Sequence, residues 1–400
     1  MVGRSLVTAL EDDWRATLDA VARARGWPTS ADVARLGERA AKLSAAYNAP
    51  ADARGGRSVA RGHELLSARL AFSFPRDVPK GAGAVRELVA CGALAMKDGL
   101  RVLDIGAGMG ATTFGAARAL ERAGARGVID ATWVDADGEA IAVGAAIAAA
   151  RRDAVIVRAT TVHGGVSRAS GDGFDLVLMG QVLSELDAGD DEDARVAKHV
   201  ALVRDAMTRL AAGGSLVIVE PALRDRTRHL HRVRDALLAG PDAPTLFAPC
   251  LHAAPCPALA SEGDWCHEDL AVDLPAWLVP IARAAGLRYQ GLTFSYLVLR
   301  RDAKTLSSIP ARGARLRVVS DPLVSKGKRE IFVCGELGRD GATVAGRARA
   351  TRLDRDRSET NAVWQHARRG DLLAIAPAPD AVRARIEKDA VVTSIQPSGD

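Results

Sequence analysis

Four of the chain's five cysteines have a pattern that suggests metal binding. Cys250, Cys256 and Cys266 fall in the proline-containing stretch "CLHAAPCPALASEGDWCH", and Cys334 follows 68 residues after Cys266. The intervals are too long and irregular for the paired C-x2-C motifs of a zinc ribbon. Three cysteines in a loop and one remote cysteine are compatible with a four-thiolate iron–sulfur site. Cys91 lies in an apolar helical pattern, and we expect it to be an ordinary buried residue.

Two histidines in the same stretch leave the identity of the metal open. His252 and His267 offer imidazole ligands, and with them zinc becomes an alternative to iron. The first residues carry acids early and contain no continuous apolar run, so they do not predict a secretory signal. We therefore expect a cytoplasmic location, where thiols stay reduced and clustered cysteines more often bind metals or catalyse reactions than form disulfides.

A second group of residues has the types and spacing of a ligand-binding turn. The segment "LDIGAGMGATT" places Asp104 and glycines 106, 108 and 110 where a strand passes into a helix. Glycines let the backbone turn tightly and approach a ligand closely. The spacing matches a dinucleotide-binding pattern only in part. Asp135 ends the next predicted strand, 29 residues beyond Gly106, where a carboxylate accepts hydrogen bonds from ribose hydroxyls.

These groups lie on or after a regular alternation of strands and helices. Apolar strand segments are predicted within 101–108, 131–137, 154–160, 174–180 and 215–221, with helical segments between them. Such alternation predicts an α/β fold with a parallel sheet. We expect a helical region at 1–98, a core at 99–302 with a cysteine-rich insertion at 240–270, a small, β-rich, barrel-like domain at 310–380, and a tail at 381–400.

Charge is unevenly distributed along the chain. The net charge is +5, but residues 301–370 hold 16 Lys and Arg against 8 Asp and Glu, which is +8. A second basic run, "LRDRTRHLHRVR", extends from Leu223 to Arg234. Both segments suit a surface for nucleic-acid phosphates, and a merely solvated face explains them equally well on charge alone. No apolar run approaches the roughly 18–20 residues of a membrane span.

The order of segments "DIGAGMG", "VDAD", "FDLVLMGQVLSEL" and "GGSLVIVEP" resembles a class I S-adenosylmethionine-dependent methyltransferase. The resemblance implies a cofactor site formed by the glycine turn, the ribose-binding Asp135 and the loop after the fourth strand. We assign to it Asp104, Gly106, Ala107, Gly108, Gly110, Asp135 and Gln181.

The catalytic residue of such a site is not apparent. The segment "QVLSELD", which we expect to be helical, has neither the Asn/Asp-Pro-Pro-aromatic motif of amino-group methylases nor the nucleophilic cysteine of cytosine-C5 enzymes. Gln181, Ser184 and Glu185 lie near the expected mouth of the site, and no catalytic role is assigned to them.

A closer resemblance is to the methyltransferase-like, mitochondrial-type small-ribosomal-subunit assembly proteins, which have bacterial relatives. It covers most of residues 40–375, through "LLSARLAFSFPRDVPKGAGAVREL", "DIGAGMGATTFGA", "VLSEL", "CLHAAPCPAL…DWCH", "REIFVCGE" and "GDLL". The resemblance implies a [4Fe–4S] cluster, for which Cys250, Cys256, Cys266 and Cys334 take the ligand positions. It also implies binding to 16S rRNA of the small subunit during ribosome biogenesis or translation.

Three functions follow from these patterns. The intact "DIGAGMG" turn and Asp135 favour an S-adenosylmethionine-dependent rRNA methyltransferase. The lack of an identifiable catalytic residue favours a catalytically inactive assembly factor that binds rRNA and uses its metal site structurally. The basic C-terminal segment and the family resemblance disfavour a small-molecule methyltransferase. The oligomeric state is not indicated by the sequence.

Overall fold

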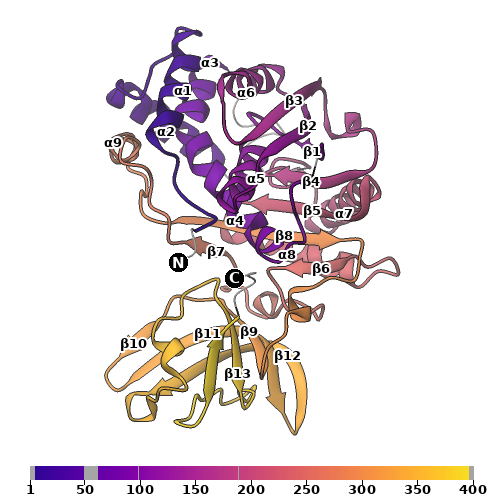
Figure 1. Ribbon diagram of the computed structural model, residues 1–400, viewed down its shortest axis with the longest axis vertical. Helices are drawn as coiled ribbons and strands as arrows, with labels where there is room; N and C mark the ends of the chain where they lie inside the picture. Colours follow the sequence, from indigo (N-terminus) through magenta and orange to yellow (C-terminus); the bar gives the residue numbers. More distant parts are fainter. Residues whose placement is uncertain (1–4, 49–61, 98, 188, 396–400) are drawn as a thin grey trace. The chain divides into compact units, whose positions relative to one another are not determined.

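The computed structural model describes residues 5–48, 62–97, 99–187 and 189–395. The chain divides into two units (Figure 1): the first comprises Met1–Pro221 and Leu270–Phe294, and the second comprises Ala222–Asp269 and Ser295–Asp400. No helix among the described residues has the length and apolar character needed to cross a membrane.

The first unit contains the predicted parallel sheet. Its strands β1 (Leu100–Ile105), β2 (Gly127–Asp135), β3 (Val155–His163), β4 (Phe174–Gly180) and β5 (Leu210–Glu220) lie in the order β3-β2-β1-β4-β5 and all run parallel (Figure 1). Helices α5 (Ala111–Arg122), α6 (Gly138–Ala150) and α7 (Glu192–Thr208) occur between them. The strand order reverses beside β1, and ligands of such sheets bind at the carboxyl ends of the strands near this reversal. The predicted α/β class is confirmed.

The predicted N-terminal helices pack against this sheet. They are α1 (Asp12–Arg23), α2 (Val33–Asn48), α3 (His63–Ala68), a π-helical turn η2 (Arg69–Ser73) and α4 (Phe74–Ala90), with the later helix α9 (Val279–Ala284) against α2. Helices α4 and α5 approach backbone to backbone, because a Cβ on Gly115 would lie 2.5 Å from the carbonyl oxygen of Val78. This contact fixes the turn before α4 over the amino end of α5.

The second unit begins with helix α8 (Arg224–Leu238). Strand β6 (Thr245–Ala248) pairs antiparallel with β8 (Leu292–Arg300), whose first three residues belong to the first unit. Between β6 and β7 (Glu268–Leu270) lies the cysteine-rich stretch, whose only regular element is the short 3-10 turn η4 (Pro257–Ala260). A segment with so little secondary structure must find other partners for its backbone groups.

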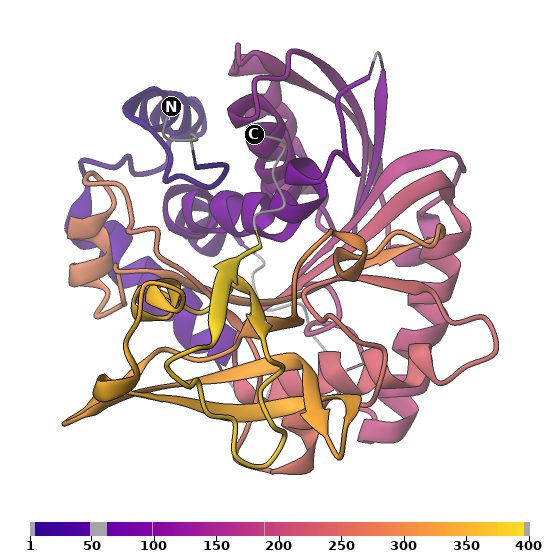
Figure 2. The same cartoon turned by 60° about the horizontal axis from the view of Figure 1, so that its bottom comes forward.

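The rest of the second unit is the predicted β-rich domain. Strands β9 (Ala314–Val318), β10 (Leu323–Ser325), β11 (Lys328–Arg339), β12 (Ala342–Leu353), β13 (Leu372–Ala376) and β14 (Val391–Ser394) form a curled antiparallel sheet (Figure 2). Short 3-10 turns η6 (Asp354–Asp356) and η7 (Ala362–Gln365) connect β12 to β13. The domain extends beyond the expected boundary at 380, because Ala384, Ile386 and Val392 lie in its core. Residues 396–400 of the expected tail lie outside the described residues.

Candidate cofactor pocket and cysteine cluster

The glycine turn after β1 is held against the end of β2. The amides of Gly106 and Ala107 both donate to the carbonyl oxygen of Val134, at 2.8 and 3.1 Å. Gly106 and Gly108 have positive φ angles of 71° and 52°, which L side chains adopt with strain. The turn therefore presents its backbone to the space above the strand ends.

Asp135 braces this turn from the neighbouring strand. One carboxylate oxygen accepts a 2.7 Å hydrogen bond from the Gly108 amide, and the other accepts one of 2.7 Å from the Asp137 amide. Asp137 in turn caps α6 by accepting a bond from Ala140. The Asp135 carboxylate is thus fixed at the rim of the pocket, and its assignment to a ribose stays a prediction.

Asp104 lies buried beneath the turn and has a structural role there. Its side chain is 1% exposed and accepts a 2.7 Å hydrogen bond from the Thr113 hydroxyl, which itself accepts one from the Trp133 indole. Burial raises the pKa of Asp104 from 3.8 to about 7. Asp104 and Gly110 do not appear among the described residues that line the cavity, so they shape the turn from behind.

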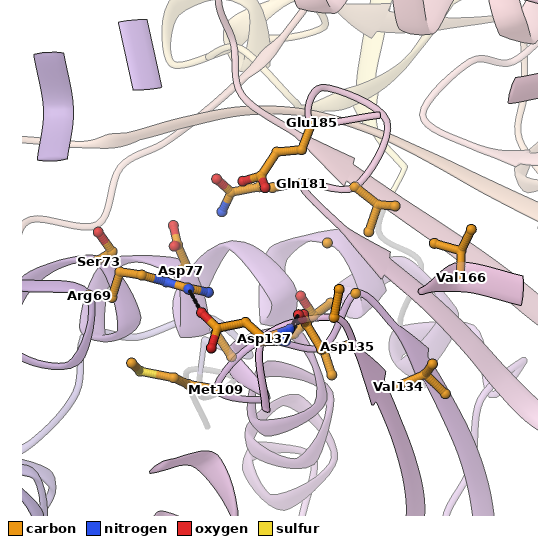
Figure 3. A pocket seen from close by; sticks show the side chains of 18 of the residues that line it. Arg69, Ser73, Asp77, Met109, Val134, Asp135, Asp137, Val166, Gln181 and Glu185 are labelled. Carbon is orange, nitrogen blue, oxygen red and sulfur yellow. Dashed lines mark hydrogen bonds and ion pairs between the residues drawn. The ribbon is translucent and has the colours of Figure 1, made fainter. Parts of the chain in front are cut away.

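A cavity of about 320 Å³ opens above the turn (Figure 3). Five of the predicted cofactor residues line it, namely Gly106, Ala107, Gly108, Asp135 and Gln181. Five further lining residues come from the N-terminal helices, where no site was predicted: Tyr47, Arg69, Ser73, Phe74 and Asp77. The volume is at the lower end of the range of about 300–1,000 Å³ for small-molecule sites.

Arg69 is the one Lys or Arg side chain among the described residues that line the cavity. Its guanidinium pairs with Asp137 at 3.3 Å and lies so close to the glycine turn that a Cβ on Gly108 would be 2.7 Å from it. Burial alone lowers the pKa of Arg69, but its acidic neighbours outweigh this and raise the pKa overall. Those neighbours are Tyr47, Glu185, Asp135 and Asp137.

The loop after β4 closes the opposite side of the cavity (Figure 3). It forms a series of turns in place of the expected helix, and Gln181 has a positive φ of 61°. The buried carboxylate of Glu220 accepts hydrogen bonds from the amides of Leu183 and Ser184, at 2.9 and 3.2 Å. These bonds satisfy amides that a helix start leaves unpaired, and they direct Gln181 and Glu185 into the cavity (Figure 3).

In the second unit, α8 holds the cysteine-rich stretch through its arginines. Arg228 donates to the carbonyl oxygens of Ala258, Ser261 and Asp264, between 2.6 and 3.1 Å. Arg234, which is 0% exposed, donates to the carbonyl oxygens of His252 and Ala254. The expectation that the run Leu223–Arg234 offers a phosphate surface is therefore wrong for its buried arginines, because their donors are used inside the unit.

The barrel holds the same stretch from the other side. Arg317 donates to the carbonyl oxygen of Pro249 at 3.0 Å, and Arg369 donates to that of His267 at 3.3 Å. Arg347 of β12 forms an ion pair with Asp264. The stretch is thus fixed between α8 and the barrel by charged donors to its backbone.

This arrangement brings together four thiols from distant parts of the sequence. Burial raises the pKa values of Cys256 to about 11 and of Cys266 to about 12, and raises that of Cys334 well above its usual range. Cys250 also raises the pKa of each of these three thiols, Cys256 raises those of Cys266 and Cys334, and Cys266 raises that of Cys334. All five cysteines lie in the described ranges and are free thiols.

The two candidate histidines differ in their relation to this group. The Nε2 of His252 lies 3.4 Å from the Sγ of Cys334. His267 stacks on Trp265 with ring centroids 5.8 Å apart. Among the described residues, no group of three or more His, Cys, Asp or Glu side chains has the arrangement that holds a metal ion. The assignment of four cysteines as ligands therefore stays a prediction.

Comparison with known families identifies the chain. A family model described as mitochondrial small ribosomal subunit Rsm22 matches residues 98–369, which is more than half of the chain. The chain belongs to the Rsm22 family. The match includes the glycine turn, the loop after β4 and all four clustered cysteines of this Rsm22-family protein. A search of curated proteins found no significant match.

Solved methyltransferase structures are similar to the Rsm22-family chain at low identity. A class I S-adenosylmethionine-dependent methyltransferase from Listeria monocytogenes is 13% identical, covers 74% of this chain and 91% of its own, and has a TM-score of 0.36. An RNA methyltransferase from Pyrococcus horikoshii is 14% identical to this chain. The match covers 56% of this chain and 84% of the Pyrococcus chain, with a TM-score of 0.33. The plantazolicin methyltransferase BpumL, solved with S-adenosylhomocysteine, is 12% identical to this chain. The match covers 67% of this chain and 96% of the BpumL chain, with a TM-score of 0.35.

Some residues that line the cavity of this Rsm22-family protein form a pattern in the sequence from which their place could have been predicted. Arg69, Ser73 and Asp77 are spaced four residues apart in a helical stretch whose other residues, apart from Arg76, are apolar, and they form a polar stripe on one helix face. Glu220 had no such signal beyond its position at the end of a strand. Cys91, expected to be buried, is exposed because α4 ends there and Cys91 becomes its C-cap.

Proposed function

We propose that this protein binds S-adenosylmethionine in the cavity above its glycine turn and acts on the small ribosomal subunit during ribosome assembly, with a [4Fe–4S] cluster on its four gathered cysteines. The observation that carries the proposal is the cavity lined by the glycine turn and Asp135 in a chain of the Rsm22 family. The reduced thiols fit a cytoplasmic protein.

The charges of the cavity suit this cofactor. Four carboxylates line it, from Asp77, Asp135, Asp137 and Glu185, and Arg69 is the counterpart cation. S-adenosylmethionine carries a sulfonium, an ammonium and a carboxylate. In our proposal Asp135 accepts hydrogen bonds from the ribose, the turn amides face the amino-acid end, and the Arg69 guanidinium binds the carboxylate in a charge-assisted contact.

If the protein is an active methyltransferase, as we propose, the acceptor of the methyl group is RNA. Gln181 and Glu185 face the cavity from the loop that borders substrate, and they position an acceptor base beside the sulfonium. The alternative is an inactive assembly factor that keeps the cofactor as a structural ligand. It is supported by this loop, whose polar side chains in the cavity include no Cys nucleophile and no Asn/Asp-Pro-Pro motif.

The chemistry of the cysteine side chains supports the iron–sulfur part of the proposal. Four mutually interacting thiols lie beside Arg234 and Arg347, and these cations stabilise the thiolates that the cluster requires. A bound cluster would join the cysteine-rich stretch to strand β11 through its bonds to cysteines of both segments. Binding of the cluster would therefore be coupled to local folding. Zinc on the same thiols, with His252 as a further donor, is the alternative.

Two measurements test the enzymatic and ribosomal parts separately. Calorimetric titration with S-adenosylmethionine should give 1:1 binding that Asp135→Ala weakens, and absence of binding in the metal-loaded protein would overturn the cofactor assignment. Incubation of 30S precursors with labelled cofactor should transfer the methyl group to 16S rRNA. Binding of the 30S particle without transfer would favour the inactive factor.

A further inference from the structure

The strands of the barrel are connected as in an OB-fold. Strand β9 pairs with β11 and β13, β11 pairs with β12, and β13 pairs with β14, all antiparallel. The chain leading into β14 meets β12 in parallel, through hydrogen bonds of 2.7 and 2.9 Å between Thr351 and residues 384 and 386. The cyclic order first, second, third, fifth, fourth strand is that of the five-stranded Greek-key barrel.

The helical connection of that barrel type is present as well. Turns η6 and η7 lie between the third and fourth strands, and Trp364 of η7 is 0% exposed in the barrel core. OB-folds bind oligonucleotides on the outer face of their second and third strands and on the adjoining loops. In this protein the second and third strands are β11 and β12.

The middle of that face is occupied by the chain itself. Cys334 of β11 and Arg347 of β12 are register partners, and Arg347 pairs with Asp264 of the cysteine-rich stretch. One part of the face away from this pairing is the end nearer to β10, the edge strand of the sheet (Figure 1).

Positive charge gathers at this end. The hairpin of β10 and β11 is tied to the turn after β12 by a 2.8 Å hydrogen bond from the Asp354 amide to the Gly327 carbonyl. We call the surface formed by these segments the β10-edge surface. Its members are Leu323, Lys326, Lys328, Arg349, Arg355 and Arg357.

The acids nearby do not neutralise this surface. Glu330 is buried and pairs with both Lys328 and Arg349, at 2.9 and 2.8 Å. Asp354 pairs with Arg357 at 2.7 Å. Lys326 and Arg355 are exposed and form no ion pair with any described residue. The surface thus keeps a net positive charge and free donors for phosphates.

One exposed aliphatic side chain, that of Leu323, projects from the same face, because Leu323 is the register partner of Glu330. Val324 is the partner of the inward-pointing Arg329 and projects from the opposite face of the strand. Leu323 is 46% exposed and Val324 is 70% exposed, and every residue of β10 faces solvent. An apolar side chain beside phosphate-binding cations matches unpaired nucleotides, because a duplex hides the faces of its bases.

We propose that the β10-edge surface binds single-stranded RNA, with Lys326 and Arg355 on the phosphates and Leu323 against the bases. This inference rests on the proposed ribosomal function and adds the RNA class and the surface that contacts it. An extended protein segment pairing with the free edge of β10 is the competing occupant, and the experiment below separates the two.

The test is fluorescence anisotropy with a labelled single-stranded 12-mer of uridine and a 12-base-pair RNA duplex, both added to full-length, metal-loaded protein. The double variant Lys326→Glu with Arg355→Glu should weaken single-strand binding about tenfold or more. It should also reduce the slope of log Kd against log salt by about 1.4, or roughly 0.7 for each lost phosphate contact. Leu323→Ser should weaken binding and leave the slope unchanged.

A matched control carries the same change of charge elsewhere on the barrel. Arg339 and Arg383 are exposed at the opposite end of the β11–β12 hairpin, and neither forms an ion pair with a described residue. Arg339→Glu with Arg383→Glu should alter binding less than twofold. Equal weakening by both double variants would overturn the inference, as would duplex binding as tight as that of the single strand.

Failure of the inference is distinguishable from failure of the proposed function. Wild-type protein that sediments with 30S particles but ignores the single strand would overturn only the RNA surface, and would favour a protein occupant of the β10 edge. Wild-type protein that binds neither would overturn the ribosomal proposal as well. Unchanged melting temperature and unchanged iron content in each variant show that altered binding does not come from misfolding.

Discussion

The Nε2 of His252 lies 3.4 Å from the Sγ of Cys334, although 82 residues separate them in the chain. This contact joins the irregular cysteine-rich stretch to a strand of the barrel. Neither partner has a nearby sequence feature that specifies the other. The contact exists because arginines of α8 and of the barrel fix the backbone of the stretch in place, and the four thiols are gathered as a result.

Replacement of Cys334 tests whether the gathered thiols share one metal. Cys334→Ser should lower the iron and sulfide content of anaerobically purified protein by more than half and reduce the absorbance near about 400 nm, where thiolate-to-iron transitions occur. Cys91→Ser is the matched control, since Cys91 is exposed and does not belong to the group. Unchanged iron in Cys334→Ser would exclude it as a ligand, and a colourless protein with bound zinc would refute the cluster.

Removal of Arg234 should destabilise the cysteine-rich stretch. Arg234→Met leaves the carbonyl oxygens of His252 and Ala254 without their donors in a buried place, and the Asp235 carboxylate without its partner. We expect a loss of about 3 kcal/mol in the free energy of unfolding, measured by urea titration. Arg224→Met on the exposed side of the same helix should change it by less than about 0.5 kcal/mol. Equal effects would show that Arg234 is not a support of the stretch.

The sheet could be predicted from the sequence, but the burial of the arginines could not. Strand–helix alternation and the glycine turn predict the core, because both follow from local periodicity and backbone conformation. The burial of Arg226 and Arg234 was not predictable, since a charged run looks the same whether its donors meet solvent or buried carbonyls. The proximity of Cys334 to the other cysteines was implied only by family resemblance, because spacing carries no information about tertiary contact.

The buried carboxyl of Asp104 should give the folded protein a distinct pH dependence. Its pKa is about 7 in the folded state and 3.8 ordinarily, so between these values the folded protein binds one more proton than the unfolded chain. Its contribution to stability is therefore greatest below about pH 4, falls as the pH rises to about 7, and is constant above that. The total is on the order of 4 kcal/mol.

Asp104→Asn should remove this dependence and keep the acceptor for the Thr113 hydroxyl. The difference in unfolding free energy between variant and wild type should grow in the variant's favour from pH 5 to pH 8, as measured by urea unfolding at each pH. Asp205, an exposed acid on α7, serves as the control site. Parallel pH profiles for wild type and Asp104→Asn would contradict the raised pKa.

Arg69 should determine how the pocket recognises the amino-acid end of its cofactor. It is the cavity's cation among the described residues and it lies over the Gly108 turn. Loss of a charge-assisted hydrogen bond costs about 1.5–3 kcal/mol, so Arg69→Gln should weaken S-adenosylmethionine binding by roughly 10- to 100-fold in calorimetry. Decarboxylated S-adenosylmethionine should bind wild type and Arg69→Gln with similar affinity, because it lacks the group that Arg69 contacts.

The comparison of the two ligands separates recognition from folding. A variant that merely distorts the glycine turn would weaken both ligands equally, and that result would contradict the assigned contact. Arg158→Gln, which removes an exposed arginine of β3 paired with Asp130, should leave both affinities unchanged. Arg69→Lys should retain part of the preference for the carboxylated ligand, since an ammonium keeps the charge but not the bidentate geometry of a guanidinium.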